Sequence, residues 1–251
     1  MLKYSKLFAL ALAFLLVGCS ISDGVSVVED FLSNYIDISN FNEISYSSNE
    51  GFDFSSIPEY NGKPYVLLNN NKADFTEGEK SLEYGYEHYS ELDELGRCGY
   101  AIAVVGLDTM PSKKRGSIGM IKPSGWHTVK YDFVDGKYLY NRCHLIGYQL
   151  TGENANVNNL ITGTRYLNME GMLDFENAID DYVEETGNHV LYKVKPIFIS
   201  DELVARGVHM QAYSLEDNGE GLQFNAFAYN VQPGVNIDYV LGGSFEIEIV
   251  D

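Results

Sequence analysis

The sequence has 251 residues, of which 45% are hydrophobic and 13% aromatic, and this is enough apolar material to bury the core of one domain. The composition excludes an intrinsically disordered or fibrous chain. Asp and Glu outnumber Lys and Arg by 36 to 17, and the formal net charge of −19 excludes a protein that coats nucleic acid through its overall charge.

The N-terminal segment has the features of an export signal. Two lysines precede an uncharged apolar run over residues 7–17, which has the length of a signal-peptide core and is too short to span a bilayer. The run ends in LVGC, which resembles a bacterial lipobox, so we expect residues 1–18 to be removed and Cys19 to carry a lipid. That anchor would hold the protein on the extracellular face of the cell membrane. The alternative is an ordinary signal peptide with a chance cysteine.

The mature chain is predicted to be a tether followed by one domain. Residues 19–56 are rich in Ser, Asn and Asp, which indicates a linker, although an apolar patch over 25–36 is compatible with a short helix. The composition changes at Ile57, so we expect a single domain over residues 57–251. The apolar runs 65–68 and 98–107 predict strands, and the second is typical of a buried strand.

A basic segment lies near the middle of this domain. Residues 113–142 contain seven basic residues and only two acidic ones, Asp132 and Asp135, in an otherwise acidic chain. The basic residues are Lys113, Lys114, Arg115, Lys122, Lys130, Lys137 and Arg142. Such a segment would attract a phosphate-rich polymer, with an affinity that falls as the salt concentration rises. A solvated charged loop is the alternative.

An Asp-Gly pair indicates a β-hairpin within the basic segment. Residues 131–133 and 138–140 flank residues 134–137, which contain this pair, and Asp-Gly between apolar runs is a strong hairpin signal. We therefore expect two paired strands, with the second strand continuing to His144.

His144 is the first candidate catalytic residue. Strand alternation places it with Arg142 on one face, and Asn141 with Cys143 on the other. A histidine at a strand end beside basic residues is suited to act on a phosphate, because a neutral imidazole can take a proton from water near neutral pH. A core histidine bonded to a carbonyl is the alternative.

A predicted helix carries an unexpected carboxylate. Apolar residues recur at helical spacing over 172–184, and Gly187 ends the pattern. Glu176 falls within the apolar stripe, where burial of an unpaired charge would cost several kcal/mol, so it requires a partner. That partner is either a metal-bound water or an arginine in a buried ion pair.

Two amides and a guanidinium lie just ahead of this helix, at Asn159, Asn168 and Arg165. Amide, carboxylate and water oxygens suit Mg²⁺, which keeps most of its waters. Asn168 and Glu176 would be about 12 Å apart in a continuous helix. Both can act on one ion only if Asn168 precedes the helix, so we expect Asn168 to bind the metal directly and Glu176 to bind it through water.

The C-terminal half is rich in strands, over residues 189–198, 208–213, 222–229 and 245–250, which together with the helix indicates a mixed α+β domain. After lipidation of Cys19, two cysteines remain in this domain, Cys98 and Cys143. Their separation cannot be read from the sequence, so both free thiols and a disulfide stay open.

The order of strand, histidine, irregular loop, asparagine and helix resembles the ββα-metal fold of the DNA/RNA non-specific endonucleases. The stretch NRCHLIGYQLTGENANVNNLITGTRYLN, residues 141–168, is similar to secreted DNases and DNA-entry nucleases of Gram-positive bacteria. The similarity covers about residues 57–250. It implies an α+β fold with a central antiparallel sheet and helices on its faces.

The resemblance also implies roles for individual residues. His144 corresponds to the general base of a DRGH-like motif, Asn168 to the metal ligand, and Glu176 to the glutamate that orients metal-bound water. The sequence departs from DRGH at Asn141 and Cys143. Asn141 can still orient its neighbours by hydrogen bonds but adds no negative charge beside the histidine.

The substrate contacts implied by the resemblance are less sharply defined. Asn159 corresponds to the asparagine that precedes the metal ligand in the family, and Asn141 adds a polar contact. Arg115 corresponds to an arginine that contacts phosphate, and Lys114 or Arg165 could serve in its place.

The resulting hypothesis is metal-assisted hydrolysis of nucleic-acid phosphodiesters. The cofactor would be Mg²⁺, with Mn²⁺ as the alternative, and the substrate DNA, with RNA as a second candidate. Little sequence preference is expected when recognition runs through phosphates. The rival hypothesis is a non-catalytic surface receptor that holds DNA for uptake or adhesion. No feature of the sequence indicates an obligate protein partner.

Overall fold

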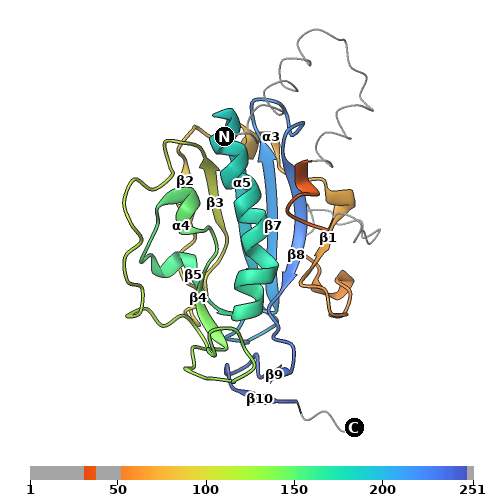
Figure 1. The fold of residues 1–251 in the computed structure, drawn as a ribbon, viewed down its shortest axis with the longest axis vertical. Helices are drawn as coiled ribbons and strands as arrows, with labels where there is room; N and C mark the ends of the chain where they lie inside the picture. Colours follow the sequence, from red (N-terminus) through yellow and green to blue (C-terminus); the bar gives the residue numbers. More distant parts are fainter. Residues whose placement is uncertain (1–30, 38–51, 248–251) are drawn as a thin grey trace.

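The computed structural model describes residues 31–37 and 52–247. Its centre is a six-stranded antiparallel sheet with the strand order β1-β8-β7-β6-β3-β2 (Figure 1). The strands are β1 (Tyr65–Leu67), β2 (Glu87–Tyr89), β3 (Ala101–Val105), β6 (Val190–Ile197), β7 (Gly207–Ser214) and β8 (Gln223–Tyr229). The predicted strands at 65–68, 98–107, 189–198, 208–213 and 222–229 are confirmed, and so is the α+β fold with a central antiparallel sheet.

Both faces of the sheet are buried, which explains the nearly continuous apolar runs of its strands. Along β3, Ala101, Ala103 and Val105 belong to one apolar cluster, whereas Ile102 and Val104 belong to another on the opposite face. Helix α5 (Leu173–Thr186) covers the first face through Phe175 and the apolar residues of its next turns, and Figure 1 shows it lying along the strands.

The opposite face is covered by short elements from the N-terminal part of the chain. These are the 3₁₀ turns η2 (Phe54–Ser56) and η3 (Asn69–Asn71) and the one-turn helix α3 (Glu77–Lys80), which begins with a capping box between Thr76 and Glu79. Phe52 and Phe54 pack against the cluster around Phe227 on this face.

The segment expected to be a tether contributes to the core. Leu32 and Ile36, four residues apart, are buried in the cluster beneath α5, and the Tyr35 hydroxyl donates a 2.6 Å hydrogen bond to Asp181. Residues 31–37 and 52–56 therefore pack on the domain instead of linking to it. The predicted signal peptide and the lipidation site Cys19 lie outside the described residues.

A two-stranded ribbon lies beside α5 and carries the histidine motif. Strand β4 (Tyr140–His144) pairs with β5 (Leu160–Thr164), so that His144 faces Leu160 in register. Two short helical segments connect them, α4 (Tyr148–Thr151) and η4 (Val157–Asn159). In Figure 1 this ribbon lies next to the N-terminal end of α5.

The predicted hairpin around Asp135-Gly136 is only a turn, so the prediction of two paired strands is wrong. The Tyr131 N–H donates to the Lys137 carbonyl, and the Lys137 N–H to the Val134 carbonyl, with Gly136 and Lys137 both at positive φ. The pairing of the flanking segments is limited to a single bridge between Lys130 and Tyr138. The backbone of β4 instead pairs with β5, which follows it in the chain after α4 and η4.

Helix α5 begins after an irregular turn. Residues Leu167–Met172 form the π-helical segment η5, which leads directly into α5, and Gly187 ends the helix at φ 72° with its N–H bonded to Val183. The predicted helix over 172–184 is confirmed. Asn168 was expected ahead of the helical segment, but it lies inside η5, whose helical backbone continues into α5. A last ribbon of β9 (Val235–Ile237) and β10 (Ser244–Glu246) lies at the end of the molecule near the basic segment.

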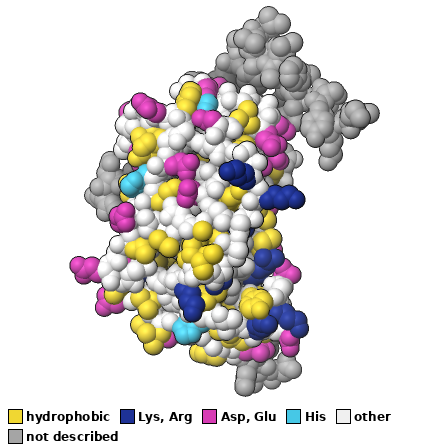
Figure 2. All heavy atoms as spheres, turned by 90° about the vertical axis from the view of Figure 1, so that its left-hand side faces the viewer, with side chains coloured by type: hydrophobic (Ala, Val, Ile, Leu, Met, Phe, Trp, Pro, Cys, Tyr) yellow, Lys and Arg dark blue, Asp and Glu magenta, His cyan; other side chains and the backbone are white. Residues whose placement is uncertain are grey.

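Charge is unevenly distributed over the surface. In Figure 2, basic side chains gather in the lower and right-hand part of the face shown, and acidic side chains predominate in its upper and left-hand part. Within the described residues, no helix has the length and apolar character needed to cross a bilayer.

Candidate active site

A cavity of about 660 Å³ lies where β4, α4 and the start of α5 meet the loop that carries Arg115. Its lining residues come from four stretches of the chain, 115–118, 126–128, 138–149 and 165–176. Six of the residues singled out in the sequence line it, namely His144, Asn168, Glu176, Arg115, Arg165 and Asn141. Arg142 and Gln149 also line it, so the fold brings one imidazole, one carboxylate, three amides and three guanidinium groups to a single concave surface.

The partners of His144 assign its tautomer. Its Nε2 lies 2.9 Å from the Asn154 carbonyl oxygen, which can only accept, so Nε2 carries the hydrogen. Its Nδ1 lies 3.2 Å from Nη2 of Arg115, which can only donate, so Nδ1 presents a lone pair. The side chain is 7% exposed and is fixed at the end of a paired strand. His144 is thus oriented with its basic nitrogen beside a cation that lines the cavity.

The surroundings of His144 favour the neutral imidazole. Burial lowers its pKa below the ordinary histidine value, and the positive charge of Arg115 lowers it further. The hydrogen bond to the Asn154 carbonyl acts in the opposite direction, because it stabilises the protonated ring. The residue can therefore accept a proton at neutral pH, and the carbonyl stabilises the imidazolium that results.

Glu176 lies in the first turn of α5, and its carboxyl group contacts Gly147, which precedes α4. Its Oε1 accepts a 2.8 Å hydrogen bond from the Gly147 N–H, and a Cβ at position 147 would lie 2.6 Å from Oε2. Only glycine allows this close approach. Burial raises the pKa of Glu176 to about 8, although the Gly147 N–H and the charge of Arg115 favour its ionised form.

The arginine ion pair considered for Glu176 does not form. Within residues 31–37 and 52–247, the ion pairs involve other carboxylates, and Arg115 donates to His144 instead. Glu176 is therefore a buried carboxylate that lacks a counter-ion in this part of the chain. A group of this kind at a cavity wall is typical of a site that receives a cation.

Asn168 lies in the π-helical segment η5, one turn ahead of α5, and lines the same cavity as Glu176. π-helical turns are frequent at functional sites, because they shift side chains out of the regular helical register. No three His, Cys, Asp or Glu side chains of the described chain form a metal-binding cluster. An amide and a carboxylate without further protein ligands fit an ion that keeps most of its waters, as Mg²⁺ does.

Comparison with known proteins identifies the family. A sequence model described as DNA/RNA non-specific endonuclease matches residues 77–215, which is more than half of the chain. The chain belongs to this endonuclease family. The match includes β4, the asparagine-rich loop, η5 and α5, and therefore all six residues that were predicted from the sequence and line the cavity.

Solved structures of nucleases share the fold of this endonuclease. A structure of NucA from Streptococcus agalactiae with magnesium bound is 25% identical, with a TM-score of 0.63 over 72% of this chain and 86% of that one. The Sda1 nuclease with bound zinc is 26% identical, with a TM-score of 0.59 over 74% and 97% of the two chains. A protein described as an extracellular endonuclease, 22% identical with a TM-score of 0.52, covers 75% of this chain and shares the fold.

Two of the residues predicted to contact substrate lie elsewhere in the endonuclease. Asn159 is fully buried, where its Oδ1 accepts from the Ile146 N–H and its Nδ2 donates to the Ile146 carbonyl. It joins η4 to the segment that follows His144, so its contacts are structural. Lys114 is exposed and is not among the residues that line the cavity.

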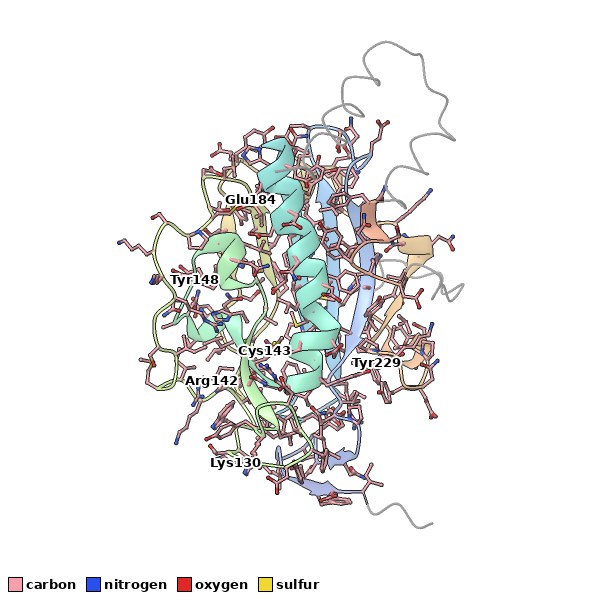
Figure 3. The ribbon with its side chains drawn as sticks, viewed as in Figure 1. Lys130, Arg142, Cys143, Tyr148, Glu184 and Tyr229 are labelled. Carbon is pink, nitrogen blue, oxygen red and sulfur yellow. The ribbon has the colours of Figure 1, made fainter. Side chains whose placement is uncertain are left out.

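The other residues of the histidine motif have different roles. Arg142 bonds the carbonyls of Gly119 and Ile121, and its guanidinium lies 4.1 Å from the ring centroid of Trp126. It thereby holds the loop that forms the outer wall of the cavity. Cys143 is buried on the α5 side of β4, and both Cys98 and Cys143 are free thiols (Figure 3). Burial raises the pKa of Cys143 well above its usual range, which excludes a reactive thiolate.

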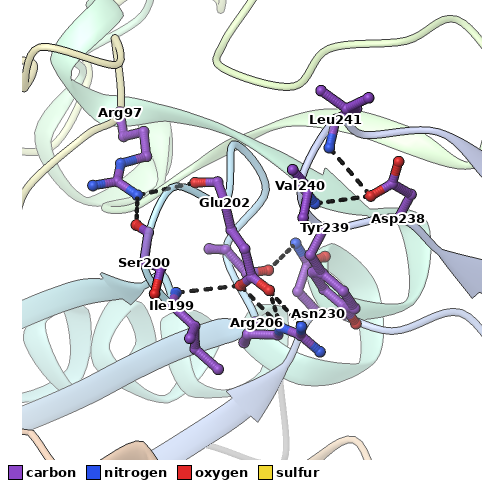
Figure 4. Close-up of polar contacts among 11 residues, drawn as sticks. Arg97, Ile199, Ser200, Glu202, Arg206, Asn230, Asp238, Tyr239, Val240 and Leu241 are labelled. Atoms are coloured by element: carbon purple, nitrogen blue, oxygen red, sulfur yellow. Dashed lines mark hydrogen bonds and ion pairs between the residues drawn. The ribbon is translucent and has the colours of Figure 1, made fainter.

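The wall next to Trp126 is supported by a polar network (Figure 4). The buried Glu202 binds Arg206, and Arg97 donates to the carbonyls of Ser200 and Glu202. This network fixes the loop between β6 and β7, whose Leu203 carbonyl accepts a 2.7 Å hydrogen bond from Ser124. The wall of the site is therefore built on the sheet through side chains that have no contact with the cavity.

Some residues of the site carry no signal in the sequence. The Asn154 carbonyl orients His144, but any residue type supplies a carbonyl, so the position cannot be recognised from its side chain. Gly147 could be noticed only as a glycine that follows the motif. Tyr138 and Thr128 line the cavity as ordinary residues of the basic segment.

Proposed function

We propose that the protein is a divalent-metal-dependent endonuclease that hydrolyses DNA phosphodiesters without sequence preference, with RNA as a second substrate. His144 is the general base, and Asn168 and Glu176 form the metal site. The observation that carries the proposal is the position of these three side chains on the wall of one cavity. The metal ions named in the NucA and Sda1 structures support a divalent cation as cofactor.

His144 accepts the proton in the hydrolysis step. Its Nδ1 lone pair accepts a proton from the attacking water as the water adds to phosphorus in line with the leaving oxygen. The ring then carries both hydrogens, and the Asn154 carbonyl at Nε2 stabilises the imidazolium. The fixed orientation of the ring removes the need to order it during the reaction.

Arg115 couples substrate binding to the release of this base. In the free protein its guanidinium donates to Nδ1 of His144 and so occupies the lone pair that the mechanism requires. A phosphate in the cavity is a stronger acceptor for a guanidinium than a neutral imidazole, so a bound substrate would draw Arg115 away. Arg115 then offsets charge on the phosphate, and Nδ1 becomes free for water.

The metal site uses the donor set of Asn168 and Glu176. A divalent cation held there would neutralise charge on a non-bridging oxygen and on the leaving 3′-oxygen. Asn168 would bind the ion directly and Glu176 through water. Gly147 holds the Glu176 carboxyl group in place by its N–H, and a bound cation would favour the ionised form of this carboxyl group, whose pKa burial raises to about 8.

The expected location follows from the sequence and the relatives. The apolar N-terminal run and the LVGC motif support export with a lipid on Cys19. The similarity to a protein described as an extracellular endonuclease also supports a position outside the cell. The formal charge of −19 then means that nucleic acid is attracted only to the basic side of the molecule.

The test is cleavage of plasmid DNA by the purified protein with Mg²⁺, with and without a chelator. The His144→Ala variant should lose at least about a hundredfold in rate, and the His88→Ala variant, which removes an exposed histidine, should keep its rate. Full cleavage in chelator, or by His144→Ala, would contradict the mechanism. Retention of DNA without cleavage by the wild-type protein would favour the receptor hypothesis.

A further inference from the structure

Arg165 lines the cavity but is already occupied by a carboxylate. Its Nε and Nη2 donate hydrogen bonds of 3.0 and 2.8 Å to the same oxygen, Oδ2 of Asp135. Arg165 directly follows β5, and its backbone N–H donates to the Leu139 carbonyl, so its position at the cavity is fixed. The guanidinium, which is 30% exposed, thus points its donors at an anion supplied by the protein itself.

The turn that carries Asp135 has a fixed shape. Val134 is 3% exposed and anchors the turn, and the Lys137 N–H closes it on the Val134 carbonyl. Gly136 and Lys137 adopt positive φ angles of 68° and 69°. Asp135 is therefore presented to Arg165 by a built turn, although its own side chain is 79% exposed and can return to solvent at little cost.

The second acidic residue of the basic segment has a different position. Asp132 pairs with Lys137 at 2.9 Å, and the two side chains are 93% and 63% exposed. Lys137 is not among the residues that line the cavity. Of the two acidic residues between positions 113 and 142, only Asp135 therefore neutralises a cation of the site.

We infer that Arg165 is a subsite for a backbone phosphate next to the scissile one, and that Asp135 occupies this subsite in the free protein as an internal competitor. This inference rests on the proposed nuclease function. A carboxylate and a phosphodiester each offer a guanidinium one negative charge and oxygen acceptors of similar geometry. When nucleic acid enters the cavity, its phosphate takes the donors of Arg165, and the Asp135 carboxylate turns to solvent.

The exchange of Asp135 for a phosphate at Arg165 weakens the binding of nucleic acid and leaves His144, Asn168 and Glu176 unchanged. When Arg165 binds a phosphate it must give up its ion pair with Asp135. The free energy that Arg165 contributes to nucleic-acid binding is therefore reduced by the free energy of that ion pair. Such a device favours polymers, whose other phosphates can hold the substrate while the exchange occurs, over short anionic fragments. Tyr138, beside the Leu139 carbonyl that holds Arg165, offers an aromatic side chain to the same region of the cavity.

The test compares Asp135→Asn with Asp132→Asn, because both substitutions remove one negative charge from the same turn. Affinity is measured from the fluorescence anisotropy of a short labelled DNA duplex in EDTA, and KM from initial cleavage rates with Mg²⁺. We expect Asp135→Asn to lower both Kd and KM about threefold and Asp132→Asn to change neither. In the Arg165→Gln background, Asp135→Asn should have no effect.

The possible results separate this inference from the proposed function. Equal effects of the two Asp→Asn variants, or a gain from Asp135→Asn that persists in the Arg165→Gln background, would overturn the competitor role. Weaker binding by Asp135→Asn would also overturn it, provided that thermal unfolding shows an intact fold. Failure of the wild-type protein to cleave DNA would reject the nuclease function, whereas the anisotropy measurements would still decide whether Asp135 competes for Arg165.

Discussion

The two buried histidines, His144 and His209, show how one residue type is used for chemistry in one region and for structure in another. His209 lies in β7 at the centre of the sheet, where its Nε2 contacts Asn225 Oδ1 at 2.7 Å and Phe52 packs against its ring. His144 ends β4, with one nitrogen fixed by a carbonyl and the other beside a cavity. Burial lowers the pKa of both, and it lowers that of His209 to about 4.

The sheet and the cavity differ in how well the fold supplies partners for their buried polar and charged side chains. In the sheet, Asn225 Nδ2 donates to the Lys72 carbonyl and Gln211 accepts from the Asp74 N–H. The Tyr192 hydroxyl in β6 is the exception, because it is buried without a hydrogen-bond partner among the described residues. At the cavity, Glu176 lacks a counter-ion and Asn141 Nδ2 lacks a hydrogen-bond partner among the described residues. Burial alone therefore does not mark a functional group, whereas an unmet charge or donor that also lines a cavity is a stronger indication.

The largest expected effect separates the two histidines directly. His144→Ala should reduce kcat by about 10²–10⁴, because it removes the proton acceptor, and should leave the melting temperature nearly unchanged. His209→Ala should do the reverse, with normal kcat per folded molecule and a lower melting temperature, because it leaves Asn225 Oδ1 without its partner. Rates and thermal unfolding on the same preparations measure both. Equal losses of activity would remove the distinction between the two sites.

Glu176→Gln sharpens the comparison through its pH dependence. Its kcat should fall about tenfold or more, because the amide cannot orient a metal-bound water as the carboxylate does. Burial raises the pKa of Glu176 from its ordinary value to about 8. Between those two pH values the folded state keeps a proton on Glu176 that the unfolded state has released. In EDTA, wild-type stability should therefore decline as the pH rises towards 8, and Glu176→Gln should lack this decline.

The control for this variant is Glu184→Gln, at the far end of the same helix (Figure 3). Glu184 is exposed, so its substitution should change neither kcat nor the decline of stability towards pH 8. Its charge contributes to raising the pKa of Asp180 to about 6, so a change in the pH dependence should be confined to pH values near 6 and below. A decline of stability that persists in Glu176→Gln would assign the titration to another group of the molecule.

Arg115→Gln tests the control of the base. The charge of Arg115 lowers the pKa of His144, so its removal should raise that pKa and move the acid limb of kcat/KM to higher pH. The loss of the phosphate contact should also reduce kcat/KM about tenfold. Lys114→Gln removes the same charge from the adjacent exposed position and should have little effect on either quantity. An unchanged acid limb in Arg115→Gln would mean that the guanidinium does not act on His144.

The smallest effect on activity is expected for His209→Gln, which tests acid stability. The folded pKa of about 4 lies below the unfolded value, so stability is complete above pH 6.5 and is lost as the pH falls towards 4. This histidine accounts for about 3 kcal/mol of the loss. Urea unfolding at several pH values should give a shallower acid slope for His209→Gln, with neutral-pH activity retained. An unchanged slope would assign the acid sensitivity to other groups.

Local patterns in the sequence predicted most of the fold and the groups of the site. The continuous apolar run 98–107 identified β3, which is buried at every position, and the helical spacing of apolar residues over 172–184 identified α5. Glu176 was recognisable as a charge within an apolar stripe. These inferences succeeded because the signals lie within one element. Asn168 was expected ahead of the helix, whereas it lies in the π-helical segment that leads into α5.

Long-range choices could not be predicted in the same way. The Asp-Gly turn is present, but β4 pairs with β5 and not with the segment before the turn. No local sequence pattern predicts which of these two pairings forms. The packing of Leu32 and Ile36 was masked by the polar composition around them. Asn159 was assigned to substrate from the resemblance, whereas its side chain bonds the Ile146 backbone. The role of the Asn154 carbonyl could not be predicted, because every residue type has a backbone carbonyl.

Chemical rescue tests most directly whether the His144 imidazole is the general base. The His144→Gly variant removes the ring and leaves space for free imidazole at the cavity wall, while Asn168 and Glu176 remain in place. Imidazole should restore Mg²⁺-dependent cleavage of plasmid DNA in proportion to its neutral fraction as the pH is varied. If a folded variant that still binds DNA gains no activity from imidazole at any pH, His144 is not the proton acceptor.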